Sequence, residues 1–288
     1  MNNLKYFLQF LIIILLFITF KFIGLRYSSI LSGKIFSYFG PLFRSNKISK
    51  SNLAKAYPNF NDDQKNQIIQ KMWFNYGKIF AEYSFIKNFR KSNKNFSKKI
   101  ITKNQDKLDK IKMNSEPVIF VSGHFNNFEL MAMHLEKSGI DLAAIYRPLN
   151  NKFLNPLMEY LRRKYICKKQ IKKGIPGTKE ILKNFKDGTS IALMIDQRVS
   201  EGILCDFFGE KAFTTSIPAQ FVKKFNAKIV PIYIERLIDD NFEININDPL
   251  IFSSNESLES ITLKLNKILE DMILRNPDQW IWTHNRWK

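Results

Sequence analysis

The pattern of hydrophobic and polar residues divides the chain into an apolar N-terminal segment and a long body, in which the hydrophobic stretches are shorter. Residues 6–20 carry no charge between Lys5 and Lys21. A helix of that length spans about 22 Å, short of the ~30 Å hydrocarbon core, but a snorkelling Lys21 would extend the run to Leu25. The run is apolar on every face, which disfavours a buried core helix, and no small-residue cleavage site of a signal peptide follows. We predict that residues 1–25 form a retained membrane anchor.

Basic residues are far more frequent after the apolar run than before it. Only Lys5 precedes the run, and six basic residues follow in the next thirty positions: Lys21, Arg26, Lys34, Arg44, Lys47 and Lys50. Positive charge gathers on the cytoplasmic side of membrane helices. The asymmetry therefore predicts a single-pass anchor with the body of the protein in the cytoplasm.

The body of the chain begins with helical patterns and continues as strands alternating with helices. Asn61 and Gln64 have capping-box spacing ahead of a helix, and residues 87–112 are predicted as a basic, partly helical connector. Strands are predicted at 117–121, 142–146, 190–195 and 228–234, with a possible edge strand at 242–246, and helices at 127–138, 151–164, 178–186, 217–225 and 257–274. This alternation predicts one α/β domain over residues 26–288, with its sheet covered on both faces.

Composition narrows the class of partner and excludes two kinds of site. Lys and Arg number 45 against 26 Asp and Glu, a formal net charge of +19 that should attract nucleic acid, anionic lipid or an acidic protein. Cys167 and Cys205 are the only cysteines, which excludes a disulfide framework and a four-cysteine zinc site. No cluster with metal-ligand spacing stands out, so no metal is expected.

The strongest candidate chemistry follows the first buried strand of the body. His124 comes directly after that strand, and Glu129 stands five residues later. If His124 lies in the turn before the helix, Glu129 can face it, fix its tautomer and raise its basicity. Such a pair can take a proton from a substrate hydroxyl without a serine or cysteine nucleophile. The alternative is a hydrogen-bonded turn histidine with no catalytic role.

The residues around this pair, and motifs elsewhere in the chain, resemble those of a known family. The motif Gly123-His124-Phe125-Asn126-Asn127-Phe128-Glu129 resembles the His-x-x-x-x-Asp/Glu signature of the lysophospholipid acyltransferase superfamily. Nearly the whole chain resembles more closely the lipid A biosynthesis acyltransferases of the lauroyl/myristoyl type. The similarity includes Tyr146-Arg147-Pro148-Leu149-Asn150-Asn151, Asp196-Gln197, Phe207-Phe208-Gly209 and Trp280-Ile281-Trp282-x-His284-x-Arg286-Trp287-Lys288. Phe128 stands where the family often has Trp, and Tyr165-Ile166 stand where a Gly usually follows the helix arginine.

The resemblance implies a single acyltransferase domain with a mixed, mainly parallel sheet flanked by helices, and a specific reaction. A fatty acyl group would pass from acyl carrier protein to the hydroxyl of a 3-hydroxyacyl chain on a lipid A precursor. His124 would be the general base and Glu129 would orient it, with no cofactor beyond the thioester donor. The expected partners are acyl carrier protein, the lipid A precursor and anionic lipid of the bacterial inner membrane.

Three more residues are expected to bind substrate. Arg147 follows the second strand at the same edge as His124, where it would bind a phosphate or an oxyanion, unless it is a surface arginine paired to a carboxylate. Asp196 follows the third strand and would position the sugar or lock an arginine, unless it only caps a loop. Arg163 is a weaker candidate, because Arg162 beside it could serve equally well.

The C-terminal residues allow two interpretations. Trp280, Trp282 and Trp287, with Arg286 and Lys288, form an aromatic and basic cluster of the kind found at membrane interfaces. The alternative is a tail packed on the core, and alternating tryptophans suit a strand with one buried face.

The sequence is also compatible with two other functions. One is an acyltransferase for another glycolipid or a lysophospholipid, although Asp196-Gln197 stands where glycerolipid acyltransferases have Pro-Glu-Gly-Thr. The other is a membrane-tethered nucleic-acid-binding protein, which the net charge permits. No helix-turn-helix, zinc finger or RNA-binding signature accompanies that charge, so no nucleic-acid partner is expected.

Overall fold

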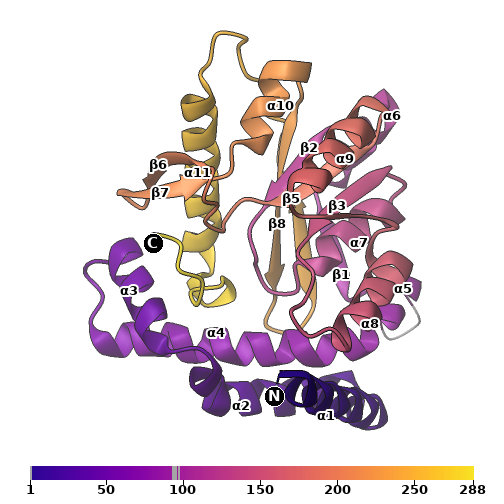
Figure 1. The fold of residues 1–288 in the computed structure, drawn as a ribbon, viewed down its shortest axis with the longest axis vertical. Helices are drawn as coiled ribbons and strands as arrows, with labels where there is room; N and C mark the ends of the chain where they lie inside the picture. The colour runs from indigo at the N-terminus through magenta and orange to yellow at the C-terminus, as the bar shows by residue number, and fades with distance from the viewer. Residues whose placement is uncertain (1, 93–95, 97) are drawn as a thin grey trace.

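The computed structural model describes residues 2–92, 96 and 98–288. Its centre is a seven-stranded sheet in the order β1-β9-β8-β2-β5-β3-β4 (Figure 1). The strands are β1 (Ile100–Lys103), β2 (Ile119–Ser122), β3 (Leu142–Tyr146), β4 (Lys169–Lys172), β5 (Ser190–Met194), β8 (Ile229–Arg236) and β9 (Phe242–Ile246). β8, β2, β5, β3 and β4 run parallel, and β9 pairs antiparallel with β8. The predicted mixed, mainly parallel α/β sheet is confirmed.

Helices cover the sheet and join its strands. They are α5 (Ile86–Lys91), α6 (Gln105–Asn114), α7 (Glu129–Lys137), α8 (Leu154–Leu161), α9 (Ile175–Lys186), α10 (Ile217–Phe225) and α11 (Leu258–Arg275). β2 is buried at all four positions, and β8 at seven of eight, since both lie inside the sheet with helices on its faces. A separate hairpin of β6 (Ile203–Phe207) and β7 (Glu210–Thr214) contacts α11.

Two edge strands are absent from the predicted elements. β1 lies within the stretch predicted as a basic connector, of which residues 93–95 and 97 are outside the described residues, and it makes β9 an interior strand rather than the edge. β4 follows a π-helical turn at Arg162–Ile166. Both are four-residue strands that begin or end in lysine, the composition that edge strands use to avoid further pairing.

The N-terminal helices form a layer across one end of the sheet (Figure 1). This layer contains α1 (Asn2–Ile23), α2 (Leu25–Phe43), α3 (Asn46–Ala56) and α4 (Asp62–Glu82). The predicted capping box of Asn61 and Gln64 is present at the start of α4. α2 crosses α4 at two glycines, where a Cβ on Gly77 would lie 2.2 Å from the Ser32 backbone oxygen and 2.7 Å from the Gly33 Cα.

α1 is long and apolar, and it is held to the body near both of its ends. Its residues Asn3–Ile23 have a mean hydropathy of 2.3, which by length and composition alone would allow a membrane span. Near its start, the Asn151 side chain donates to the Tyr6 carbonyl over 2.9 Å. Near its end, Phe20 is buried against Phe80 of α4. α1 therefore lies along the domain rather than projecting from it.

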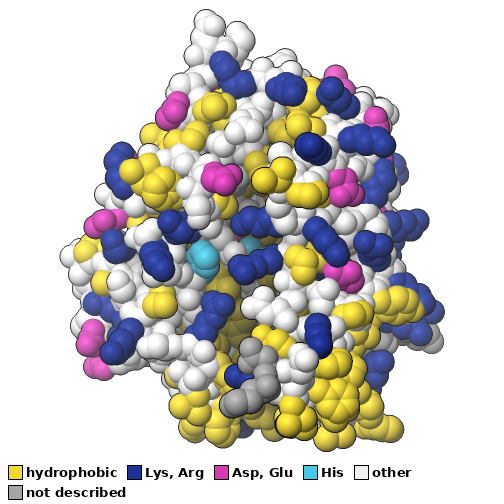
Figure 2. Space-filling view, viewed as in Figure 1, with side chains coloured by type: hydrophobic (Ala, Val, Ile, Leu, Met, Phe, Trp, Pro, Cys, Tyr) yellow, Lys and Arg dark blue, Asp and Glu magenta, His cyan; other side chains and the backbone are white. Residues whose placement is uncertain are grey.

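α1 and α2 together expose a large apolar surface, which we call the α1–α2 face. Its side chains are more than a third exposed and appear among the hydrophobic side chains at the base of the molecule in Figure 2. The face comprises Leu4, Phe7, Leu8, Leu11, Ile12, Leu15, Ile18, Phe22 and Ile23 of α1 with Tyr27, Leu31, Ile35, Tyr38, Phe39, Leu42 and Phe43 of α2. Contiguous apolar surface of this extent marks a site of interaction with protein or membrane.

The C-terminal tryptophans are part of the core. Trp280 is 1% exposed and Trp282 0% exposed, and their rings make an edge contact with each other. Arg286 is fully buried and donates to the Phe213 carbonyl. The interpretation as an interfacial cluster is therefore wrong for these three residues, and the packed tail is correct. Trp280 forms a single β-bridge with Phe125 instead of entering a strand.

Candidate active site

His124 and Asp196 meet at the carboxyl edge of the sheet. β2 and β5 are parallel neighbours, with Ser122 opposite Met194, so the residues that follow them emerge side by side. His124 Nδ1 lies 2.7 Å from Asp196 Oδ1, and the His124 backbone N–H donates to Asp196 Oδ2 over 2.8 Å. The carboxylate only accepts, so it fixes the proton on Nδ1 and leaves Nε2 with a free lone pair.

Burial and charge act in opposite directions on this pair. The Asp196 side chain is fully buried, and the His124 side chain is 22% exposed. Burial by itself lowers the pKa of His124, but the charge and hydrogen bond of Asp196 outweigh it, so the pKa is raised. Burial would raise the pKa of Asp196, and the interactions with His124 and Trp280 lower it overall. The pair is thus a base stabilised by an ionised partner.

A third group holds Asp196 from the C-terminal segment. The Trp280 indole Nε1 donates to Asp196 Oδ2 over 2.9 Å, so both carboxylate oxygens are engaged. On the open side of the imidazole, Gln197 Nε2 lies 3.5 Å from His124 Nε2. The Gln197 amide can only donate to this nitrogen, and the contact is long, so Nε2 is the ring atom at which a substrate hydroxyl could take its place.

Glu129 does not contact His124, and the predicted His–Glu hydrogen bond is wrong. It accepts from Arg162 Nε over 2.8 Å and from the Tyr83 hydroxyl. Glu129 is the first residue of α7, and its carboxylate faces Tyr83 in the 3-10 turn Tyr83–Phe85 and Arg162 in the π-helical turn after α8. Phe128 takes the place beside His124, with their ring centroids 4.7 Å apart.

The Glu129 cluster is a second buried charge arrangement. The Arg162 and Glu129 side chains are 12% and 9% exposed. Burial together with the neighbouring Glu129 raises the pKa of Tyr83 well above its ordinary value, so Tyr83 stays a neutral donor. Among the described residues, Arg162 Nη1 is buried and has no hydrogen-bond partner. Arg162 therefore keeps one N–H direction unused.

The loop between His124 and Glu129 is braced from behind. Asn126 has a left-handed backbone with φ 41°, and its N–H donates to the Gln279 carbonyl over 2.9 Å. Asn127 donates to Glu82 of α4 over 2.9 Å, and Arg236 of β8 donates to the same carboxylate over 2.5 Å. These buried contacts explain how a short loop keeps the imidazole in one place.

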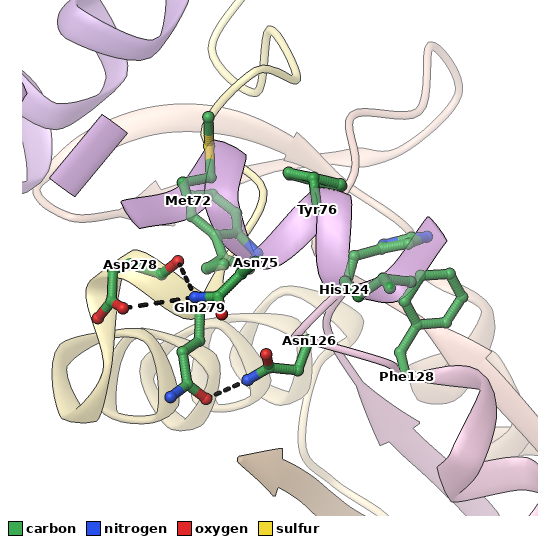
Figure 3. A pocket seen from close by; sticks show the side chains of 10 residues that line it. Met72, Asn75, Tyr76, His124, Asn126, Phe128, Asp278 and Gln279 are labelled. Carbon is green, nitrogen blue, oxygen red and sulfur yellow. Dashed lines mark hydrogen bonds between the residues drawn. The ribbon is translucent and has the colours of Figure 1, made fainter. Parts of the chain in front are cut away.

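A narrow pocket lies between this loop and α4. Figure 3 shows His124, Phe128 and Tyr76 on one side of it and Met72, Asn75 and Gln279 on the other. Its volume is about 10 Å³, which is room for about one water. Because residues of α4 line the pocket together with His124, α4 lies directly over the edge of the sheet that carries His124.

Of the other predicted residues, only Asp196 joins this centre. Arg147 follows β3 and is exposed, and Arg163 is exposed in the turn after α8. α8 begins at Leu154, three residues later than the predicted start at 151 and seven residues after Arg147, so this arginine is well separated from the helix start. Neither arginine forms a hydrogen bond or ion pair with the described residues. The predicted locking of an arginine by Asp196 is not what the structure shows, because Asp196 holds His124.

Sequence reasoning missed the roles of Arg162, Tyr83 and Trp280. The sequence pattern gives Arg162 only as an equal alternative to Arg163, and it does not distinguish Tyr83 as a site residue. The signal for the His124–Asp196 contact was present, since both residues follow buried strands at one edge of a parallel sheet. This shared edge is a better indicator of contact than the local spacing of His124 and Glu129.

The fold and site define an α/β protein with a buried histidine–carboxylate pair at the carboxyl edge of its sheet. Residues 1–288 match the family described as bacterial lipid A biosynthesis acyltransferase, and the chain belongs to this family. It is 20% identical to a lipid A biosynthesis acyltransferase of Haemophilus influenzae, over 91% of this chain and 81% of that protein. It is 23% identical to lipid A biosynthesis acyltransferase 2 of Shigella flexneri, over 80% and 74%.

Among solved structures, the chain is similar to the 1-acyl-sn-glycerophosphate acyltransferase PlsC of Thermotoga maritima. The sequence identity is 14%, and the match covers 90% of this chain and all of that one, with a TM-score of 0.42.

Proposed function

We propose that this protein transfers a fatty acyl group from acyl carrier protein to the hydroxyl of a 3-hydroxyacyl chain on a lipid A precursor. The observation that supports this reaction is the His124–Asp196 pair, whose Nε2 carries no proton and has only a long contact with Gln197. The family supplies the lipid A precursor as acceptor class, and a base at Nε2 suits a substrate that brings its own nucleophilic hydroxyl. The thioester is the only activated group required, so we propose no further cofactor.

In the proposed reaction, His124 Nε2 takes the proton of the acceptor hydroxyl while the oxygen attacks the thioester carbonyl carbon. A tetrahedral oxyanion forms, and the carbon–sulfur bond then breaks. The leaving sulfur takes the proton back from Nε2, so the products are an ester and a free thiol. Asp196 stabilises the imidazolium that exists between the two proton transfers.

The unused N–H of Arg162 is our candidate for an oxyanion donor. A guanidinium that is largely buried interacts strongly with developing negative charge. Glu129 and Tyr83 fix the other side of this arginine, which makes Glu129 a positioning residue rather than the partner of the base. Arg147 and Arg163 stay predictions as acceptor contacts, and their exposure leaves them free for that role.

We further propose that the α1–α2 face contacts the inner membrane from the cytoplasmic side. Its exposed apolar side chains and the basic residues Lys21, Arg26 and Lys34 suit an anionic lipid surface. That α1 crosses the bilayer remains a prediction. The contacts of Tyr6 and Phe20 with the body favour a helix embedded along one leaflet.

A transfer assay tests the reaction. The purified protein is incubated with a phosphorylated lipid A precursor and a set of acyl carrier protein thioesters, and the lipid is analysed by mass spectrometry. We expect the mass of one acyl group to be added, and His124→Ala to lower the rate by about 10⁴-fold, the upper range for acid–base assistance. Near-normal transfer by His124→Ala would show that another group is the base.

A further inference from the structure

A second pocket lies beside the catalytic centre and is lined by cations. It is open, with a volume of about 380 Å³, and its charged lining residues are Arg44, Arg198 and Lys288, with His284 and Thr283 between them. No aspartate or glutamate side chain lines it, and none of the ion pairs formed by the described residues involves these three cations. Figure 2 shows histidine side chains in a hollow with Lys and Arg around it.

The pocket is joined to the active site through consecutive residues. The Gln197 side chain approaches His124 Nε2, and Arg198 follows it into the pocket. The Arg198 backbone N–H donates to His284 Nε2 over 3.0 Å, which anchors this turn to the C-terminal segment. A group bound in the pocket would therefore lie close to the hydroxyl presented to His124.

The two arginines of the pocket have hydrogen-bond donors available for a ligand. Arg198 Nε donates to the Lys288 backbone oxygen over 2.8 Å, and Arg198 stacks on Phe213 with its guanidinium 5.6 Å from the ring centroid. Its two Nη groups have no hydrogen-bond partner in the part of the chain that the structure describes. Arg44 is held only weakly, by two contacts of 3.5 Å to Thr283.

His284 adds a neutral donor. Burial lowers its pKa to about 4, so the ring is uncharged near neutral pH. Its Nε2 accepts from Arg198, which puts the ring proton on Nδ1. The pocket is thus lined by three basic side chains and one neutral imidazole.

Resting on the proposed function, we infer that this pocket binds a phosphate monoester of the lipid acceptor and so positions the reacting hydroxyl at His124. A phosphate monoester carries nearly two negative charges at pH 7, which three cations without a competing carboxylate side chain match. The phosphodiester of a carrier-protein arm has one charge, so the donor is the less suitable source.

Steady-state kinetics of the full chain test the source of the phosphate. For Arg198→Gln, and separately for the exposed Arg44→Gln, we expect the apparent KM for the phosphorylated acceptor to rise about tenfold. The KM for the donor should not change. Lys47→Gln, an exposed charge loss on α3 outside the pocket, is the matched control and should match the wild type. A raised donor KM with an unchanged acceptor KM would overturn the assignment, as would wild-type constants in both variants.

A binding measurement separates this inference from the transfer reaction itself. Glucosamine 1-phosphate, tenfold above its Kd, should raise the Tm of the wild-type protein by about 3 °C, and glucosamine should not. Arg198→Gln should lose this shift, and Lys47→Gln should keep it. If the wild type transfers no acyl group yet shows the phosphate-dependent shift, the proposed function fails and the pocket assignment stands. No shift in the wild type would overturn the pocket assignment.

Discussion

Two buried carboxylates, Asp196 after β5 and Glu129 at the start of α7, have partners that differ in kind. Asp196 is paired with His124, whose charge can change near neutral pH, whereas Glu129 is paired with Arg162, whose charge is permanent. A carboxylate beside a titratable group can support proton transfer. A carboxylate beside a permanent cation can only hold that cation in place. In the proposed mechanism, the glutamate of the sequence motif is therefore the positioning residue, and His124 has its carboxylate partner 72 positions away.

The largest effect that separates the two carboxylates is expected at Asp196. Asp196→Asn removes the negative charge that raises the pKa of His124 and leaves the burial that lowers it. We expect kcat to fall about 10³-fold. Activity needs the neutral imidazole, so it is lost as pH falls through the pKa of His124. The acid limb of the kcat/KM profile should therefore move to lower pH in the variant.

Asp141→Asn is the control for this experiment. Asp141 lies before β3 at the opposite end of the sheet and pairs with Lys169. Its replacement should leave both the rate and the acid limb as in the wild type. An unmoved acid limb in Asp196→Asn would mean that the two residues are not coupled in the working enzyme.

A smaller effect of a different type is expected at Glu129. Glu129→Gln should release Arg162 from its fixed position and lower kcat about 10²-fold, in the range found when one oxyanion donor is lost. The Glu129 charge also raises the pKa of His124, but less than Asp196 does, so the acid limb should move to lower pH by less than in Asp196→Asn. The measurement is the full pH profile of kcat/KM, beside a thermal unfolding curve that checks the fold.

Glu136→Gln is a matched control on the same helix. Glu136 pairs with Arg90 over 2.6 Å and is also mostly buried, but it lies outside the catalytic centre. It should lose some stability and keep its rate. A shift of the acid limb in Glu129→Gln as large as that in Asp196→Asn would contradict the division between the two carboxylates.

The smallest expected effect concerns the hydrogen bond from Trp280 to Asp196. Trp280→Phe keeps most of the ring volume and removes one donor, so kcat should fall two- to tenfold, as for one net hydrogen bond. Trp282→Phe loses a comparable buried bond, from its indole to the Pro277 carbonyl over 2.6 Å, and should leave the rate unchanged. Equal losses in the two variants would assign Trp280 a purely structural role.

The interior of the fold could be predicted from hydrophobic patterns because its strands are buried runs between amphipathic helices. β2, β5, β8 and α10 lie within two residues of their predicted ranges. The edge strands β1 and β4 could not be predicted, because a charged four-residue strand has no pattern of its own and forms by pairing with a neighbour.

For the site, the positions of residues along the chain could be predicted from the sequence, but their contacts could not. The position of His124 after a buried strand and of Asp196 after another was predictable. Their contact depends on β2 and β5 being neighbours, which is a property of strand order and not of either strand. The partner of Glu129 depends on the turn after α8, whose π-helical geometry carries Arg162 inward.

The attachment of α1 near both of its ends has a consequence for how substrates are found. A helix fixed along the body by Tyr6 and Phe20 cannot act as a flexible tether. A bilayer in contact with the α1–α2 face would set one height and one tilt for the whole domain, with α4 between the lipid and the sheet. His124 would then sample a thin slab of depth parallel to the membrane, so a lipid hydroxyl would be selected by its distance from the membrane plane as well as by its chemistry. The search for the acceptor would become two-dimensional.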